Sequence, residues 1–155
     1  MAISGGARAN LTGNALEKYV EHCLLSGGYI FVSRKVFKSV IGEGRPVYTK
    51  QFPAGTSIYN TPISADFAVY HPQKCPGCLI IEVKWQQVGG SVDEKYPYLV
   101  LNIQRRYPYH TILLLDGGGY KKGAEQWIRD QAGSGNLAYV FNMSQFQTWA
   151  NKGGI

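Results

Sequence analysis

The chain has 155 residues, of which 45% are hydrophobic and 17% are charged, and its formal net charge is +6. This length and composition predict a single globular domain over residues 1–155 with a substantial core. No apolar run approaches the roughly 18 residues that a membrane-spanning helix needs, so we expect no membrane partner. The start of the chain lacks the apolar run of a signal peptide. The positive charge is compatible with a polyanionic partner but does not identify one.

The three cysteines, Cys23, Cys75 and Cys78, are an odd number in a chain without a secretion signal, which favours a reduced cytoplasm. The pair Cys75-x-x-Cys78 surrounds Pro76 and Gly77 and is interpreted as a plain turn. A structural zinc site is the alternative, but such a site needs about four ligands and the chain offers no second pair. A redox pair would normally precede a helix.

Residues 1–10 are expected to be flexible, and the first helix to begin at a cap on Thr12 or Asn14. Ser26-Gly27-Gly28 should end it. Apolar residues recur at helical spacing between these limits: Leu16, Tyr19, Val20, Cys23 and Leu24.

Two glutamates occupy different positions on the wheel of this helix. At about 100° per residue, Glu17 lies only about 20° from Leu24, at the edge of the buried stripe. Glu21 lies further round, towards solvent. Glu17 is therefore the acid that can lean over a sheet, although an ordinary surface glutamate is the alternative.

Strands are predicted over 29–32 and 47–52, separated by a glycine-rich turn over 42–46, and a loop over 53–62 follows. Basic residues stand beside aromatic ones in this region and again after the glycines at 117–119. Such residues suit a phosphate-contacting edge, with a solvated loop as the alternative. The candidate DNA-binding residues are Lys35, Lys38, Arg45, Lys50, Lys121 and Lys122.

The next two strands, 63–70 and 78–86, should form a hairpin with its tight turn at 75–78. Alternation along the second strand separates an apolar face from a polar one, because side chains of a strand point to opposite faces in turn. Ile81, Val83 and Trp85 share the first face, and Glu82, Lys84 and Gln86 share the second. Charged side chains are rarely buried unless they are paired or bind a metal.

Four further elements follow from apolar periodicity and capping signals. They are a helix from the Ser91-x-x-Glu94 capping box to about Arg106, a buried strand over 111–115, a helix over 123–131 with Trp127 and Ile128 inward, and a strand over 137–141. A short helix should start at Ser144. This order predicts an α/β fold with a mixed central sheet flanked by helices.

The polar face of the hairpin suggests a specific chemistry. Asp66 lies near the start of the first strand and can add a second carboxylate beside Glu82. Two carboxylates can hold a hard divalent cation, which stabilises charge on a phosphate. A neighbouring lysine, here Lys84, can orient or deprotonate an attacking water. The alternative is a surface hairpin whose polar residues are solvated.

The pattern Ala65-Asp66, fifteen intervening residues and then Glu82-Val83-Lys84-Trp85-Gln86 resembles the motif of the PD-(D/E)XK nuclease superfamily. Ala65 stands where the family usually has a proline, which binds no metal. The resemblance implies a restriction-endonuclease-like fold and Mg²⁺ held by Asp66 and Glu82, with Mn²⁺ able to substitute. It also implies that Glu17, from the first helix, completes the metal site. Lys84 would then activate water, and Gln86 would position Lys84, the water or a phosphate.

The leading hypothesis is therefore a Mg²⁺-dependent DNA endonuclease that leaves 5′-phosphates, most simply a type II restriction-like enzyme acting as a symmetric homodimer. A Holliday-junction resolvase or a phage or repair nuclease of the same fold is the alternative. Two other classes stay open: a DNA-binding module without catalysis, and a zinc or redox protein built on the cysteine pair.

Overall fold

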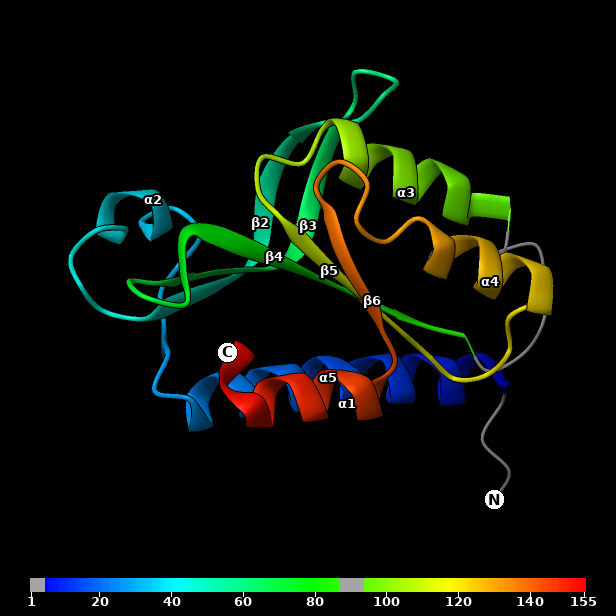
Figure 1. Cartoon of the computed structure of the whole chain (residues 1–155), viewed down its shortest axis with the longest axis horizontal. Coiled ribbons are helices and arrows are strands. Elements are labelled where there is room, and N and C mark those ends of the chain that lie inside the picture. Colours follow the sequence, from blue (N-terminus) through cyan, green and yellow to red (C-terminus); the bar gives the residue numbers. More distant parts are fainter. Residues whose placement is uncertain (1–4, 87–93) are drawn as a thin grey trace.

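The computed structural model describes residues 5–86 and 94–155. Within these residues a six-stranded mixed sheet has helices on both faces, with α1 and α5 on one side and α3 and α4 on the other (Figure 1). The strands are β1 (Ile30–Phe31), β2 (Val47–Thr56), β3 (Pro62–His71), β4 (Cys75–Trp85), β5 (Thr111–Asp116) and β6 (Leu137–Phe141). The helices are α1 (Gly5–Ser26), α2 (Phe37–Val40), α3 (Tyr96–Arg105), α4 (Lys122–Asp130) and α5 (Met143–Trp149), and a π-helical turn (Ala150–Gly154) follows.

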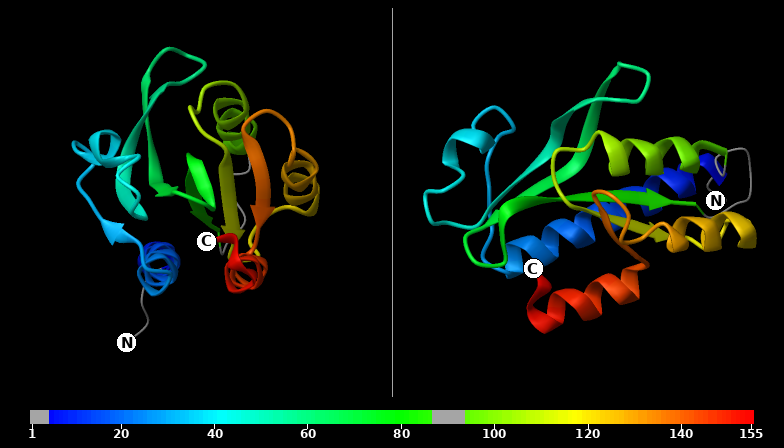
Figure 2. Two further views of the ribbon diagram at one scale, coloured as in Figure 1. Left: turned by 60° about the vertical axis from the view of Figure 1, so that its left-hand side comes forward. Right: turned by 45° about the horizontal axis from the view of Figure 1, so that its top comes forward.

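The strands lie in the order β1-β2-β3-β4-β5-β6. β2, β3 and β4 form an antiparallel meander, while β1, β5 and β6 each run parallel to the neighbouring strand. Parallel neighbours need a crossover, and α3 and α4 supply the crossovers to β5 and β6. Figure 2 shows the two helical layers on either side of the sheet. The predicted α/β fold with a mixed central sheet is confirmed.

Each face of the sheet has its own apolar core. Leu16, Val20 and Leu24 of α1 pack with Ile81 and Val83 of β4 on one face. On the other face, α3 and α4 cover alternate residues of the same strands. The strand β5 is buried on both faces, as its continuous apolar run predicted. Full burial of one such side chain contributes roughly 1.5–3 kcal/mol, so these cores hold the central strands firmly in place.

The N-terminal half departs from the sequence-based expectation in two elements. Helix α1 begins at Gly5, so residues 5–10 are helical and the predicted start at Thr12 or Asn14 is wrong. Ala7, Ala9 and Leu11 are good helix formers, which extends the helix past the polar residues. β2 likewise runs on to Thr56, because Pro53 lies beside a register shift, where a strand tolerates proline.

The turn of the hairpin lies at 72–74, and the predicted turn at 75–78 is wrong. The ring nitrogen Nδ1 of His71 accepts hydrogen bonds from the backbone N–H groups of Gln73 and Lys74, both at 3.1 Å, and so stabilises the earlier turn. Cys75 and Cys78 consequently belong to the start of β4, and both thiols are free.

The C-terminal helices are close to their predicted positions. Pro97 lies in the first turn of α3, where a proline is tolerated, and Ser91 of the predicted capping box lies outside the described residues. Ile128 is buried as predicted, but Trp127 is 40% exposed, because consecutive residues of a helix point about 100° apart. Asn142 caps α5 with a capping box. None of the helices within the described ranges is long and apolar enough to cross a bilayer.

Candidate active site

β3 and β4 separate in the middle of the sheet. The ladder between them runs from His71 and Cys75 to Phe67 and Ile81, and beyond this last pair β3 pairs with β2 and β4 pairs with β5. Asp66 and Glu82 are the first residues past that point, one on each strand. The sheet therefore opens between the two carboxylates.

The side chain of Asp66 takes the place of the missing ladder partner. Its Oδ2 accepts a hydrogen bond of 2.8 Å from the backbone N–H of Val83 on β4. This contact satisfies an amide that the strand separation would otherwise leave unpaired. It also fixes Asp66 at the edge of the opening, beside Glu82.

A kink in β2 lies opposite Asp66. Gln51 has a φ of 51°, in the left-handed region that residues other than glycine, asparagine and aspartate seldom adopt. Lys50 accordingly lies over the Phe67 ring on the α1 side, whereas Phe52 packs into the core on the α3 side. Backbone strain of this kind concentrates at functional sites.

Glu82 is an ionisable group deep in the protein, with only 2% of its surface exposed. Its Oε1 accepts a hydrogen bond of 2.7 Å from the Tyr107 hydroxyl. Burial first, and then the negative charge of Asp66, raises the pKa of Glu82 from 4.5 to about 8. The two neighbouring carboxylates repel each other when both are ionised, and a proton or a cation between them relieves that repulsion.

Lys84 reaches the same carboxylate from the outside. Its Nζ lies 3.7 Å from Oε2 of Glu82, and its side chain is 39% exposed against 3% for Glu82. The ammonium group therefore stands at the mouth of the opening, where it can meet both water and a phosphate. Glu82, Lys84 and Gln86 lie on one face of β4, as the alternation predicted, but Glu82 and Gln86 are buried, so the alternative of a solvated hairpin is wrong.

Gln86 holds the end of β4 in place. Its Oε1 accepts a hydrogen bond of 2.9 Å from the Tyr96 hydroxyl, and its Nε2 donates one of 3.3 Å to the carbonyl of Gly119. The loop after β5 approaches so closely that a Cβ on Gly117, whose φ is 109°, would lie 2.3 Å from the Gln86 carbonyl oxygen. Gln86 thus ties β4 to α3 and to this loop, while its catalytic role stays a prediction.

Both α1 glutamates face the sheet. Burial, followed by the charge of Asp66, raises the pKa of Glu17, while Lys50 and Lys84 act in the opposite direction, so Glu17 lies within electrostatic range of the site. Glu21 accepts a hydrogen bond of 2.7 Å from the Tyr48 hydroxyl, and its predicted orientation towards solvent is wrong. Residues four apart on a helix share one face, so the helix brings both acids to the sheet.

The donor set fits a small divalent cation. In the described parts of the chain no three His, Cys, Asp or Glu side chains cluster closely enough to hold a metal ion, so Glu17 as a third ligand stays a prediction. Mg²⁺ commonly binds through one or two carboxylates and completes its shell with water and substrate phosphate. The pair of Asp66 and Glu82 meets that requirement.

The predicted DNA-binding residues do not share one surface. Lys35, Lys38 and Arg45 lie in or beside α2, whereas Lys121 and Lys122 begin α4 at the other end of the sheet (Figure 1). Two of the six form ion pairs with nearby acids, Lys50 with Glu21 at 3.7 Å and Arg45 with Glu43 at 3.4 Å. Their contact with DNA stays a prediction.

Three tyrosines of the site were missed by the sequence analysis. Tyr107 binds Glu82, Tyr96 binds Gln86, and the Tyr120 hydroxyl donates to the backbone carbonyls of Lys84 and Asp116, at 3.1 and 2.7 Å. Tyr96 lies in the first turn of α3, Tyr107 follows that helix, and Tyr120 precedes α4. No spacing in the sequence links these tyrosines to the motif, because they belong to three separate segments that only the tertiary fold brings to the site.

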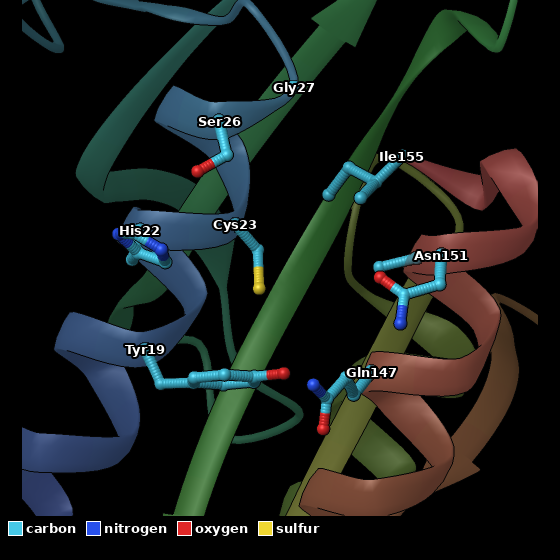
Figure 3. A pocket seen from close by; sticks show the side chains of 9 residues that line it. Tyr19, His22, Cys23, Ser26, Gly27, Gln147, Asn151 and Ile155 are labelled. Atoms are coloured by element: carbon cyan, nitrogen blue, oxygen red, sulfur yellow. The ribbon is translucent and has the colours of Figure 1, made fainter.

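A separate cavity of about 400 Å³ lies between α1 and the C-terminal segment. Figure 3 shows its polar lining of Tyr19, His22, Cys23, Gln147 and Asn151. The acidic pair and Lys84 are not part of this lining. The opening between β3 and β4 is therefore the candidate active site.

A family model described as the PD-(D/E)XK nuclease superfamily domain matches residues 8–154, nearly the whole chain. The chain belongs to this superfamily. Nucleases of the PD-(D/E)XK superfamily generally use divalent metal ions. Neither a curated protein nor a solved structure matches the chain. Asp66, Glu82 and Lys84, the residues predicted from the sequence, lie together where the strands separate, while their catalytic roles stay a prediction.

Proposed function

We propose that this PD-(D/E)XK protein is a Mg²⁺-dependent DNA endonuclease that leaves 5′-phosphates, with Mn²⁺ able to substitute. One observation carries the proposal: Asp66 and the buried Glu82 meet where β3 and β4 separate, with the Lys84 ammonium 3.7 Å from Glu82. A like-charged pair in such surroundings favours a bound cation, and the adjacent lysine supplies a proton-handling group.

Each side chain of the site has a separate role in the proposed phosphodiester hydrolysis. Asp66 and Glu82 would hold the cation, which supplies Lewis-acid stabilisation of the charge that develops on the phosphate. Lys84, at the mouth of the opening, orients a water molecule, which loses a proton to solvent as it attacks. The water attacks phosphorus in line with the 3′ oxygen. The bond between phosphorus and that oxygen breaks, the 3′ oxygen takes up a proton from solvent, and the phosphate stays on the 5′ side. Tyr107 keeps the Glu82 carboxylate in one position throughout.

A type II restriction-like enzyme, located in the cytoplasm and acting as a homodimer, remains the first proposal from the sequence. One site per chain supports dimerisation, since cutting both strands of a duplex takes two sites. A resolvase or a phage or repair nuclease is the second candidate. A specific observation favours it, the exposed aromatic pair described in the next subsection.

Cleavage assays with isosteric variants test the proposal. Duplex, branched and single-stranded DNA are incubated with the protein and Mg²⁺, Mn²⁺ or EDTA, and the product ends are mapped. We expect metal-dependent cleavage with 5′-phosphate ends that Asp66→Asn and Glu82→Gln abolish. Glu43→Gln, on an exposed loop, serves as the control. Undiminished cleavage by either site variant would refute the assignment. DNA binding without cleavage under every condition would instead identify a non-catalytic module.

A further inference from the structure

The loop of the β2–β3 hairpin, residues 57–61, extends beyond the body of the sheet beside α3 (Figures 1 and 2). Tyr59 stands in this loop with 71% of its surface exposed, more than any other exposed large hydrophobic side chain in the described ranges. Its ring stacks on that of Tyr98 of α3, with centroids 5.1 Å apart and planes 22° from parallel. One face of Tyr59 is thus covered by Tyr98.

The loop that holds Tyr59 is internally hydrogen-bonded. Ser57, which is fully buried, accepts hydrogen bonds on its Oγ from the backbone N–H groups of Tyr59 and Thr61, at 3.1 and 3.3 Å. The Ser57 and Thr61 hydroxyls are also bonded at 2.7 Å. Asn60 adopts a φ of 60°, a conformation that asparagine tolerates. The turn is therefore fixed before any ligand arrives.

Helix α3 anchors this turn to the rest of the domain. The buried Asn102 accepts a hydrogen bond of 2.9 Å on its Oδ1 from the backbone N–H of Ile58. Side-chain hydrogen bonds with Ser57 and Asn102 lower the pKa of Tyr98, which places the Tyr98 hydroxyl at the base of the loop. The two rings are consequently held by one hydrogen-bonded unit.

An aromatic ring that stays exposed to water contributes little hydrophobic free energy, while ordering the loop that carries it costs conformational entropy. A ligand that covers the ring would offset that cost. An unpaired nucleobase has the right shape, and stacking of one base on an aromatic side chain contributes about 1–3 kcal/mol. The bases inside an intact duplex are already stacked on each other and cannot reach the ring.

We propose that the Tyr59–Tyr98 pair stacks an unpaired base of the DNA substrate, so that the preferred substrate carries a single-stranded segment or a branch. The inference rests on the proposed nuclease function, whose substrate class it narrows. A fully paired recognition site, as expected for a restriction-like enzyme, would leave the pair without a ligand.

Charge and distance agree with this assignment. Arg105 and Arg106 are exposed at the end of α3, and Arg105 lies seven residues after Tyr98, two turns along the same face. Their guanidinium groups can contact the backbone of the DNA strand whose base is stacked.

The distance between the tyrosine pair and the carboxylates also fits one DNA strand. Asp66 lies four residues after Pro62, where β3 begins, which is about 13 Å and corresponds to roughly four stacked nucleotides. The same strand can thus reach both the pair and the carboxylates.

Binding measurements on protein that cannot cleave test the inference directly. The Lys84→Met variant, with and without Tyr59→Ser, is titrated against a single-stranded oligonucleotide, a duplex with an overhang and a blunt duplex. 2-Aminopurine in the unpaired segment reports stacking through its fluorescence. We expect Tyr59→Ser to weaken binding of the first two DNAs by about 5- to 150-fold, the range that one stacked base predicts. Binding of the blunt duplex should change less than twofold.

Tyr59→Phe is the matched control, because it keeps the ring and should bind like the parent. Tyr59→Trp gives a second readout, since stacking of a base should quench the indole fluorescence, and this variant decides the matter if Tyr59→Ser fails to fold. Equal affinities of parent and Tyr59→Ser, or an equal loss for all three DNAs, would overturn the inference. Because no cleavage is needed, Tyr59-dependent binding by a protein that never cuts DNA would refute only the nuclease function.

Discussion

Glu82 should make the protein less stable as the pH rises when no divalent cation is present. Its pKa in the folded protein is about 8, above the ordinary value of 4.5, because the carboxyl group is buried beside Asp66. Between pH 4.5 and about 8, Glu82 of the folded protein therefore keeps a proton that the unfolded chain has released. The resulting stabilisation is fully present below pH 4.5 and is lost as the pH rises through about 8.

The magnitude is large for a domain of this size. Each unit of difference in pKa corresponds to about 1.36 kcal/mol, so ionising Glu82 should cost several kcal/mol of a total stability of about 5–15 kcal/mol. At roughly 2–4 °C per kcal/mol, the melting temperature should fall by about 10 °C between pH 5 and pH 9. Glu82→Gln removes the titrating group while keeping its shape, and should flatten this dependence.

The assay is thermal unfolding in EDTA from pH 5 to pH 9, followed by circular dichroism, for wild type, Glu82→Gln and Glu43→Gln. Wild type and the control should lose stability with rising pH, and Glu82→Gln should lose much less. Adding Mg²⁺ should stabilise wild type more at pH 9 than at pH 6, because a cation must compete with the proton at the lower pH. Parallel curves for wild type and Glu82→Gln would refute the reasoning, since Glu82 would then ionise without cost.

Three further variants probe other parts of the site. Lys84→Ala should slow single-turnover cleavage by roughly two to four orders of magnitude while calorimetry still detects Mn²⁺ binding, and cleavage within threefold of wild type would show that Lys84 takes no part. Glu17→Gln should slow cleavage more than Glu21→Gln, whose hydrogen bond with Tyr48 is structural, and equal rates in two folded variants would leave Glu17 as a surface residue. Gly117→Ala should destabilise the fold by more than the ~1–2 kcal/mol that a left-handed conformation costs an alanine, because its Cβ would also clash with the Gln86 backbone just after β4. Gly118→Ala, with a φ of 72° and open space, is the matched control, and equal melting temperatures of the two variants would contradict the clash.

Local patterns in the sequence were sufficient for much of the fold. Alternation along β4 separated Ile81 and Val83 from Glu82 and Lys84, since a strand exposes its two faces in turn whatever surrounds it. The apolar stripe of α1 and the continuous apolar run of β5 predicted a helix against a sheet and a strand buried on both faces. These signals depend on residues close together in the chain, which is why they can be recognised in a single sequence.

Boundaries were less well determined, because they depend on hydrogen bonds that composition does not reveal. The Pro76-Gly77 pair favoured a turn there, yet the bonds that His71 accepts placed the turn at 72–74. The cap expected at Thr12 or Asn14 gave way to a helix starting at Gly5. At the turn, a preference of about 1 kcal/mol lost to the two hydrogen bonds of the His71 ring, and at the helix start the helix propensity of Ala7, Ala9 and Leu11 outweighed the cap signal.

The sequence by itself predicted that Asp66, Glu82 and Lys84 carry the chemistry, from residue type and spacing, and the same motif predicted the superfamily, which the family model confirms. Only the tertiary structure decided that β3 and β4 separate between the carboxylates, that Tyr107 contacts Glu82 and that Glu21 faces the sheet. The physical reason is the sequence separation of the residues that interact. Periodicity shows which face of a strand a side chain occupies, but what covers that face depends on segments tens of residues away, and so do its burial and its pKa.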